Sequence, residues 1–140
     1  MTARSPPVEV PRFRSADVEI TADLAGPADG APVILLHGGG QTRGAWGGAL
    51  AEGARRGFRM ISADLRGHGE SGWSPDGRYS FFQRADDLRE VLDDAGGTAI
   101  LIGASMGGIT SMEAISGELF WPDRVPALVL VGIVVRPPRA

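Results

Sequence analysis

The most informative stretch of this chain is TAILIGASMGGITSMEA, residues 98–114. An apolar, strand-like run over 98–102 leads into GASMG, residues 103–107, and a helix-like run follows. A serine framed by two glycines between a strand and a helix is typical of a nucleophile elbow, a tight turn that exposes the serine hydroxyl. Gly103 and Gly107 carry no Cβ that would collide where such a turn brings the backbone close together. The stretch therefore predicts a buried strand, a sharp turn at Ser105 and a helix.

A glycine-rich loop follows an earlier strand-like run. Residues 32–36, PVILL, are apolar and lead into HGGGQT, residues 37–42. Glycines let the backbone approach a ligand closely, so the free N–H groups of this loop can serve as hydrogen-bond donors. A dinucleotide-binding turn is the alternative, because Gly38-x-Gly40-x-x-Arg43 supplies its first two glycines and Asp64 ends the next strand-like run. Arg43 stands where that turn favours glycine or alanine, which argues against the alternative.

A third motif completes the series and supports a family resemblance. FRMISAD, residues 58–64, reads as a strand and continues into LRGHGESG, residues 65–72. The HGGG loop resembles the oxyanion loop of the α/β-hydrolase superfamily, and the D-x-R-G-H-G-x-S segment is similar to the loop after strand 4 in many of its members. Together with the serine elbow, the motifs stand in the order of that family, each after a strand. The resemblance covers about residues 17–135.

The resemblance implies an active site and a reaction. Ser105 would be the nucleophile, and the backbone N–H groups of Met106 and of Gly39, or alternatively Gly40, would hold the oxyanion. In this family the strand before His37 lies beside the strand before Ser105, which would bring the two loops together at one edge of the sheet. The implied activity is hydrolysis of an ester or related acyl bond of a small molecule through an acyl-serine intermediate, with no cofactor and no metal.

Serine at the elbow also restricts the chemistry. Haloalkane dehalogenases and epoxide hydrolases of the family carry aspartate at this position, so the resemblance argues against both activities. Cofactor-free haloperoxidase-like enzymes, C–C-bond hydrolases and acyltransferases share the serine elbow and remain open.

The partners that Ser105 needs do not follow it in this sequence. No histidine comes after Ser105, and no Asp or Glu comes after Asp123, whereas the family places its triad acid and histidine after the sixth strand. We therefore expect the N-terminal part of an α/β-hydrolase, either truncated or taken from a longer protein. The alternatives are an inactive fragment that only binds a partner, and a half-enzyme that a second chain completes.

The ionisable residues that are present are expected to play structural roles. His37 and His68 are the candidates for a substitute base, but we expect both to be loop histidines held by backbone hydrogen bonds. Asp64 is expected to brace its own loop, and Asp123 to lie at the opposite edge of the sheet from the elbow. Four further carboxylates are expected to be solvated on the polar face of a helix: Asp86, Asp87, Asp93 and Asp94.

Composition limits the class of protein. The 140 residues, 43% hydrophobic and 22% charged, suffice for one domain with a core. A net charge of −3, with no arginine cluster among aromatics, argues against nucleic-acid binding. The absence of cysteine excludes disulfides and zinc–thiolate sites. The first eleven residues lack the apolar stretch of a signal peptide, and no run approaches the roughly 20 apolar residues of a membrane span, so a cytoplasmic location without membrane association is expected.

The order of periodic segments predicts an α/β fold: a mostly parallel sheet flanked by helices, an incomplete α/β-hydrolase core of about six strands. Strands are expected over 17–24, 32–36, 58–64, 98–102 and 125–135, and helices over 44–56, 80–94 and 105–116. Ser80 and Gln83 form a capping-box pattern at the start of the second helix. The buried stripe of that helix is expected to contain Phe82, Ala85, Leu88 and Leu92. Residues 1–16 are expected to be a flexible arm and residues 17–140 the partial domain.

The last predicted strand, 125–135, is strongly apolar. At the edge of a sheet, an apolar strand with unpaired backbone groups invites pairing with another chain. We therefore expect the chain to self-associate through this strand.

Overall fold

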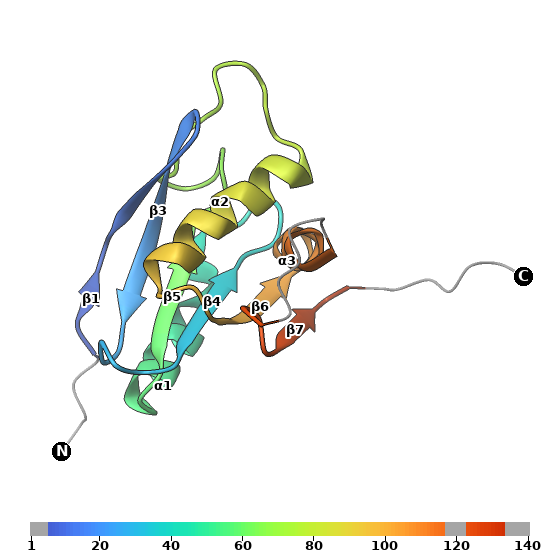
Figure 1. Cartoon of the computed structure of the whole chain (residues 1–140). Helices are drawn as coiled ribbons and strands as arrows, with labels where there is room; N and C mark the ends of the chain where they lie inside the picture. The colour runs from blue at the N-terminus through green and yellow to red at the C-terminus, as the bar shows by residue number, and fades with distance from the viewer. Residues whose placement is uncertain (1–5, 117–122, 134–140) are drawn as a thin grey trace, which may run out of the picture.

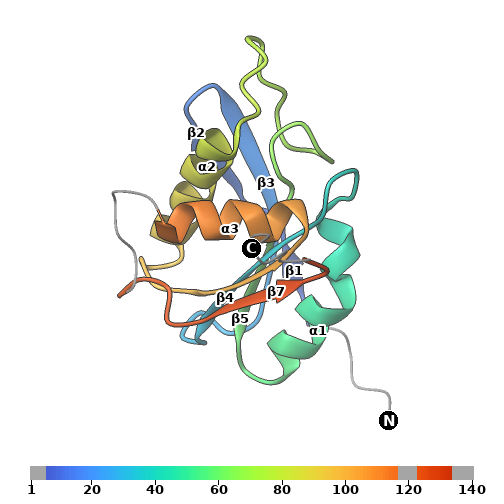
Figure 2. The same cartoon turned by 90° about the vertical axis from the view of Figure 1, so that its right-hand side faces the viewer.

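The computed structural model describes residues 6–116 and 123–133, which form one sheet with helices on both of its faces (Figures 1 and 2). The strands are β1 (Val8–Glu9), β2 (Arg12–Ser15), β3 (Val18–Ala25), β4 (Pro32–Leu36), β5 (Arg59–Ala63), β6 (Ile100–Ala104) and β7 (Leu128–Val131). The helices are the short 3-10 helix η1 (Arg43–Trp46) and the α-helices α1 (Gly47–Arg55), α2 (Phe81–Asp94) and α3 (Met106–Ser116).

The sheet has the order β1-β3-β5-β4-β6-β7, and β2 pairs with β3 as well. β4 pairs in parallel with β5 on one side and β6 on the other, and β6 pairs in parallel with β7. β3 runs antiparallel to β5. The predicted mostly parallel α/β sheet is confirmed. The register places Leu36 opposite Gly103, so the loops that follow β4 and β6 leave the sheet side by side.

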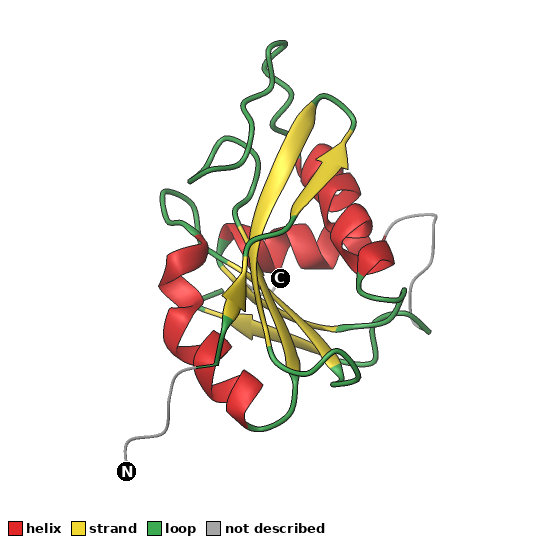
Figure 3. Ribbon diagram, turned by 90° about the vertical axis from the view of Figure 1, so that its left-hand side faces the viewer, coloured by secondary structure: helices red, strands yellow, loops and turns green. Residues whose placement is uncertain are grey.

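Side chains of the central strands alternate between two hydrophobic layers, as the pleat of a strand requires. Ile34 and Leu36 of β4 belong to the layer that α2 and α3 cover, whereas Val33 and Leu35 face α1. Figures 2 and 3 show α1 on one side of the sheet and the pair α2 and α3 on the other. Apolar side chains on both faces explain why the strands read as continuous hydrophobic runs in the sequence.

The N-terminal segment departs from the expected arm over residues 1–16. Residues 8–15 contribute β1 and β2, which pair antiparallel with β3. Phe13 lies opposite Ile20 and packs against the buried core. The physical reason is that a buried strand such as β3 needs partners for its backbone N–H and C=O groups on both edges.

The capping box of α2 is confirmed, but its predicted buried stripe is partly wrong. Ser80 Oγ accepts from Gln83 N–H, and Gln83 Oε1 accepts from Ser80 N–H at 2.9 Å. Ala85, Leu88 and Leu92 are buried as predicted, whereas Phe82 is 70% exposed. The buried face is centred near Leu88 and includes polar Arg84 and Asp87. At 100° per residue, Phe82 points roughly 120° away from that centre.

Several element boundaries also differ from expectation; β6 (Ile100–Ala104), for example, lies two residues after the predicted 98–102. The helix predicted over 44–56 begins with the 3-10 turn η1 before α1. The last strand, β7, is shorter than the predicted 125–135, and residues 134 and 135 lie outside the described residues.

Candidate active site

Ser105 occupies a strained turn between β6 and α3. Its φ is 49°, a left-handed conformation that costs a residue with a Cβ about 1–2 kcal/mol. Its N–H donates to Val131 O at 3.1 Å, and its carbonyl oxygen accepts from Ile109 N–H at 3.0 Å. The residue is exposed. The turn therefore fixes the backbone of Ser105 and leaves its side chain at the surface, as the sequence predicts for an elbow.

Two glycines allow the backbone to close tightly around the serine. A Cβ on Gly103 would lie 2.6 Å from the carbonyl carbon of Gly107, and a Cβ on Gly107 would lie 2.3 Å from the carbonyl oxygen of Leu36. These two positions are the ones that the motif predicts. A Cβ on the next glycine, Gly108, would lie 2.2 Å from Ile133 Cδ1, which is the end of a flexible side chain and can shift.

The glycine-rich loop after β4 lies against the elbow. A Cβ on Gly38 would be 3.6 Å from Ser105 Cβ, and a Cβ on Gly39 would be 3.2 Å from Met106 Cε. The loop is closed on itself, because Gln41 N–H donates to Gly38 O at 3.1 Å and Gly38 N–H donates to Gln41 Oε1 at 3.0 Å. The structure thus brings together Ser105, Met106 and Gly39, the three predicted site residues.

His37 is fully buried at the base of this loop. Its Nδ1 lies 2.7 Å from Gly38 O, which can only accept, so Nδ1 carries the proton. Its Nε2 accepts from Leu65 N–H at 2.9 Å. Burial lowers the pKa of His37, which keeps the ring neutral. Both ring nitrogens are bound to backbone, so His37 has the structural role that the sequence predicted and is not free to act as a base.

His68 lies beside it, on the loop after β5. Its Nε2 accepts from Gly40 N–H at 3.2 Å, and its Nδ1 lies 3.1 Å from the carbonyl oxygen of Arg66. The centroids of the His37 and His68 rings are 5.0 Å apart. His68 is likewise a loop histidine held by backbone hydrogen bonds, as predicted.

Asp64 braces two loops rather than its own alone. Its buried carboxylate accepts from Arg43 N–H at 2.6 Å, from Arg43 Nη1 at 2.5 Å and from Glu70 N–H at 3.0 Å. Burial alone would lower the pKa of Arg43, but its hydrogen bonds to Asp23, Glu70 and Asp64 outweigh that effect and raise it. In a dinucleotide-binding turn, Asp64 would have to receive a ribose and position 43 would have to be small. Neither condition holds, which argues further against that alternative.

Asp123 lies far along the sheet from Ser105. The next residue, Arg124, accepts from Ala99 N–H at 2.9 Å through its carbonyl oxygen, just before β6 begins. Ser105 follows the other end of β6. The predicted placement of Asp123 at the opposite edge from the elbow is therefore confirmed.

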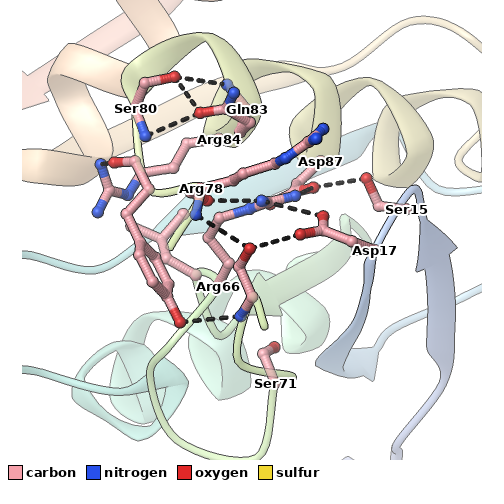
Figure 4. A network of polar contacts seen from close by, with 12 residues as sticks. Ser15, Asp17, Arg66, Ser71, Arg78, Ser80, Gln83, Arg84 and Asp87 are labelled. Carbon is pink, nitrogen blue, oxygen red and sulfur yellow. Dashed lines mark hydrogen bonds and ion pairs between the residues drawn. The ribbon is translucent and has the colours of Figure 1, made fainter. Parts of the chain in front are cut away.

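A buried ion pair joins the loop after β5 to α2 (Figure 4). Arg66 is 1% exposed; its Nε donates to Asp87 Oδ2 at 2.7 Å and its Nη2 donates to Asp87 Oδ1 at 2.8 Å. The hydrogen bond with Asp87 is the main reason that the pKa of Arg66 is raised. Ser15 Oγ also donates to Asp87 Oδ1, at 2.5 Å, and Arg66 Nη1 lies 3.2 Å from Asp17 Oδ1.

The expectation that Asp87 is solvated is therefore wrong. The other carboxylate of the Asp86-Asp87 pair behaves as expected, because the Asp86 side chain is 61% exposed. Sequence periodicity assigns both to the polar face of a helix, but burial of the charge depends on Arg66, which lies 21 positions away. The sequence signal that could have found the pair is the arginine of the D-x-R-G-H-G-x-S segment, which needs a carboxylate if it is buried.

The described residues hold no group of three or more His, Cys, Asp or Glu side chains arranged to bind a metal ion. The expected lack of a cofactor stays a prediction. Within the same residues, no helix is long and apolar enough to cross a membrane.

Comparison with known proteins agrees with the fold and with the motifs. Residues 31–140 match the model of the family described as the alpha/beta hydrolase fold. The chain belongs to this family of α/β-hydrolases.

Individual relatives cover most of this chain. An esterase of Mycobacterium tuberculosis is 37% identical over 102 residues, which make up 72% of this chain and 32% of the esterase. A non-heme chloroperoxidase of Burkholderia pyrrocinia is 32% identical over 120 residues, or 84% of this chain and 42% of that enzyme. The chain thus spans about a third to two-fifths of the length of these relatives.

Among solved structures, epoxide hydrolase A of Mycobacterium thermoresistibile superposes with a TM-score of 0.83. The superposition covers 95% of this chain and 41% of the hydrolase, at 24% identity. An identity this low supports the fold and not the activity.

Proposed function

We propose that this chain carries the nucleophile and the oxyanion hole of a serine hydrolase that cleaves an ester or related acyl bond of a small molecule. The observation that carries the proposal is the backbone of Ser105, which has a φ of 49° and an exposed side chain directly beside the Gly38–Gly39 backbone. A strained residue at a strand–helix turn is a feature of functional sites, because the surrounding fold has to enforce it.

In the proposed reaction, a base takes the proton of Ser105 Oγ as that oxygen attacks the carbonyl carbon and forms a tetrahedral intermediate, and the same proton later goes to the leaving alcohol. The carbonyl oxygen becomes an oxyanion, which the N–H groups of Gly39 and Met106 hold. Collapse of the intermediate breaks the bond to the leaving alcohol, which takes up a proton and leaves an acyl-serine that water then hydrolyses. Met106 begins α3, so the positive end of the helix dipole also faces the oxyanion.

Hydrogen bonding favours Gly39 over Gly40 as the second donor. Gly40 N–H already donates to His68 Nε2. Gly39 N–H has no acceptor among the residues that the structure describes. A backbone N–H without an internal acceptor at the surface is available to a ligand.

The base that activates Ser105 is not one of the two histidines of this sequence, because backbone groups occupy the ring nitrogens of both. The proposal takes the triad histidine and acid to lie outside these 140 residues, whose match to the related esterase covers 32% of that enzyme. This arrangement also favours a second candidate: the chain is a half-enzyme that another polypeptide segment completes. An inactive binding module is the outcome if nothing completes it.

The serine at the elbow supports acyl chemistry over epoxide opening, in spite of the structural similarity to an epoxide hydrolase. That similarity is at 24% identity. The esterase and chloroperoxidase relatives are consistent with a serine nucleophile, and we propose the esterase class first.

The test is covalent labelling of the natively produced protein with a fluorophosphonate, followed by intact mass and peptide mapping. Serine attack on phosphorus with loss of fluoride leaves a stable adduct on an activated serine only. We expect an adduct on Ser105 that Ser105→Ala abolishes and that Ser116→Ala, an exposed serine of the same helix, retains. No adduct on Ser105 would overturn the proposal. Labelling of the native protein but not of the 140-residue chain would support the completing segment, whereas equal labelling of both would contradict a base outside these residues and reopen His37 and His68 as candidates.

A further inference from the structure

The loops after β4 and β5 are joined by a reciprocal pair of histidine contacts. His37 of the first loop accepts from Leu65 N–H of the second loop at 2.9 Å. His68 of the second loop accepts from Gly40 N–H of the first loop at 3.2 Å. The ring centroids are 5.0 Å apart, so the two contacts lie next to each other. The His37 contact supports the buried base of the loop, and the His68 contact reaches its exposed tip.

The exposed tip of the loop after β4, at Gly40, makes few contacts besides the hydrogen bond to His68. Gly40 has a φ of 75°, and a Cβ built on it would find no atom within 4 Å. A side chain at position 40 would therefore point into open space. The turn closed by Gly38 and Gln41 and the hydrogen bond to His68 are the contacts that set its position.

We propose that His68 is a positioning residue for the oxyanion hole: its imidazole holds the Gly39–Gly40 peptide in place through Gly40 N–H, so that Gly39 N–H is aimed at the oxyanion. This inference rests on the proposed function of Gly39. It assigns a role to the histidine of the D-x-R-G-H-G-x-S segment, which the reaction itself does not use.

The contact requires a neutral ring in one tautomer. His68 Nδ1 faces the carbonyl oxygen of Arg66, which can only accept, so Nδ1 must carry the proton and Nε2 the lone pair. A doubly protonated ring would direct an N–H from Nε2 toward Gly40 N–H, and two donors cannot bond to each other. Protonation of His68 therefore releases the tip of the loop.

Other ionisable groups near these loops are largely tied to one another. His37 is kept neutral by burial. Arg43 binds Asp64 at 2.5 Å and Glu70 at 2.9 Å, and it also binds Asp23 of β3.

Hydrogen exchange in the resting protein tests the contact directly. Gly39 and Gly40 both follow a glycine, so their intrinsic exchange rates are closely matched, and only Gly40 N–H is bonded. We expect Gly40 N–H to exchange about 3- to 10-fold more slowly than Gly39 N–H, as one modest hydrogen bond predicts. Equal rates would overturn the proposal. The ratio should fall to about 1 in His68→Ala.

A pH titration supplies a second readout if His68→Ala does not fold. In the unmodified chain, we expect the Gly40 amide proton resonance to move with the same midpoint as the His68 ring signals, and the ring to be the Nδ1–H tautomer at neutral pH. A Gly40 resonance that does not shift during the titration would contradict the proposal. So would an Nε2–H tautomer of the His68 ring.

Labelling then connects the contact to the reaction. In protein that reacts with the fluorophosphonate, His68→Ala should slow adduct formation on Ser105 about 10-fold, and His68→Gln, which retains an acceptor, should recover part of the rate. An unchanged rate in His68→Ala would show that the contact between His68 and Gly40 does not position the oxyanion hole. If Ser105 does not react at all, the proposed function fails, yet the exchange ratio still tests the contact between His68 and Gly40.

Discussion

The α-carbon of Gly107 lies against the carbonyl group of Leu36, so that a Cβ at position 107 would be 2.3 Å from the carbonyl oxygen and 2.6 Å from the carbonyl carbon. Backbone cannot move away as a flexible side chain can. Gly107→Ala should therefore lower the free energy of unfolding by about 3 kcal/mol or prevent folding, because it forces β4 and α3 apart. Chemical denaturation measures the change.

The matched control for this substitution is Gly48→Ala in α1. A Cβ there has no atom within 4 Å, and the residue is helical. Because alanine is the better helix former, Gly48→Ala should raise the free energy of unfolding by about 0.5–1 kcal/mol. Equal stability of the two variants would show that the elbow does not pack as described.

The buried pair of Arg66 and Asp87 predicts a large difference between neighbouring carboxylates. Asp87→Ala leaves the Arg66 guanidinium buried without its partner and should cost about 3–5 kcal/mol of unfolding free energy. Asp86→Ala removes an exposed side chain and should change it by less than about 0.5 kcal/mol. Urea denaturation of both variants gives the comparison.

A double variant tests whether the cost comes from the uncompensated charge. Arg66→Met with Asp87→Leu removes both charges, so it should be clearly more stable than Asp87→Ala alone. A double variant as unstable as the single one would mean that loss of the other contacts of Arg66, such as its 2.7 Å hydrogen bond to Arg78 O, dominates instead.

The same pair shows why part of this structure could not be predicted from the sequence. The strand–turn–helix around Ser105 is a local pattern: hydrophobic runs and glycine spacing are enough to predict it, and the parallel sheet follows from the alternation of such units. Burial of Asp87 depends on a partner 21 residues away, and Asp86 and Asp87 are indistinguishable by periodicity. Local reasoning therefore predicts the wrong environment for Asp87.

Two further features of the structure also depend on residues far away in the sequence. β2 has no strong alternation of its own and forms because β3 offers an open edge. A Cβ on Gly108 would meet Ile133 Cδ1, beyond the next strand, and no short motif around the elbow could have identified this contact. The predicted site residues Ser105, Gly39 and Met106 lie together in the structure, because adjacent parallel strands bring their loops to one edge of the sheet.

Burial of neutral His37 makes stability depend on pH. Its pKa in the folded chain lies below the ordinary value of 6.5, chiefly because burial disfavours the charged ring. As the pH falls below about 6.5, the unfolded chain binds a proton that the folded chain does not, so the free energy of unfolding should decrease. Above that pH the contribution is complete. Thermal unfolding at pH 7.5, 6.5 and 5.5 measures this slope.

A variant separates His37 from other titrating groups. His37→Gln should be less stable at every pH but should show a smaller loss between pH 7.5 and 5.5, whereas His68→Gln should retain the part of the slope due to His37. Stability that rises as the pH falls through this range would contradict the assignment of a buried, neutral His37.

The outer strand of the described sheet, β7, leads to a prediction about association. β7 is the last strand in the sheet order, and Val129, Leu130 and Val131 are 46%, 38% and 44% exposed. Leu130 lies close to Gly108 of α3, so Val129 and Val131 face the opposite side, beyond β6. An apolar groove of about 360 Å³ lies on that side, lined in part by Ile100 and Ile102.

An apolar strand edge next to an apolar groove favours pairing with a second copy, so the 140-residue chain should elute as a dimer or larger species at micromolar concentration. Lysine at both Val129 and Val131 should shift it toward the monomer, because charged side chains on an edge oppose strand pairing. The matched control places lysine at Val8 and Val10, which are each 50% exposed but lie at the other side of the sheet. Light scattering coupled to gel filtration measures the mass. A monomeric unmodified chain, or an equal shift in both double variants, would show that β7 is not the surface through which copies associate.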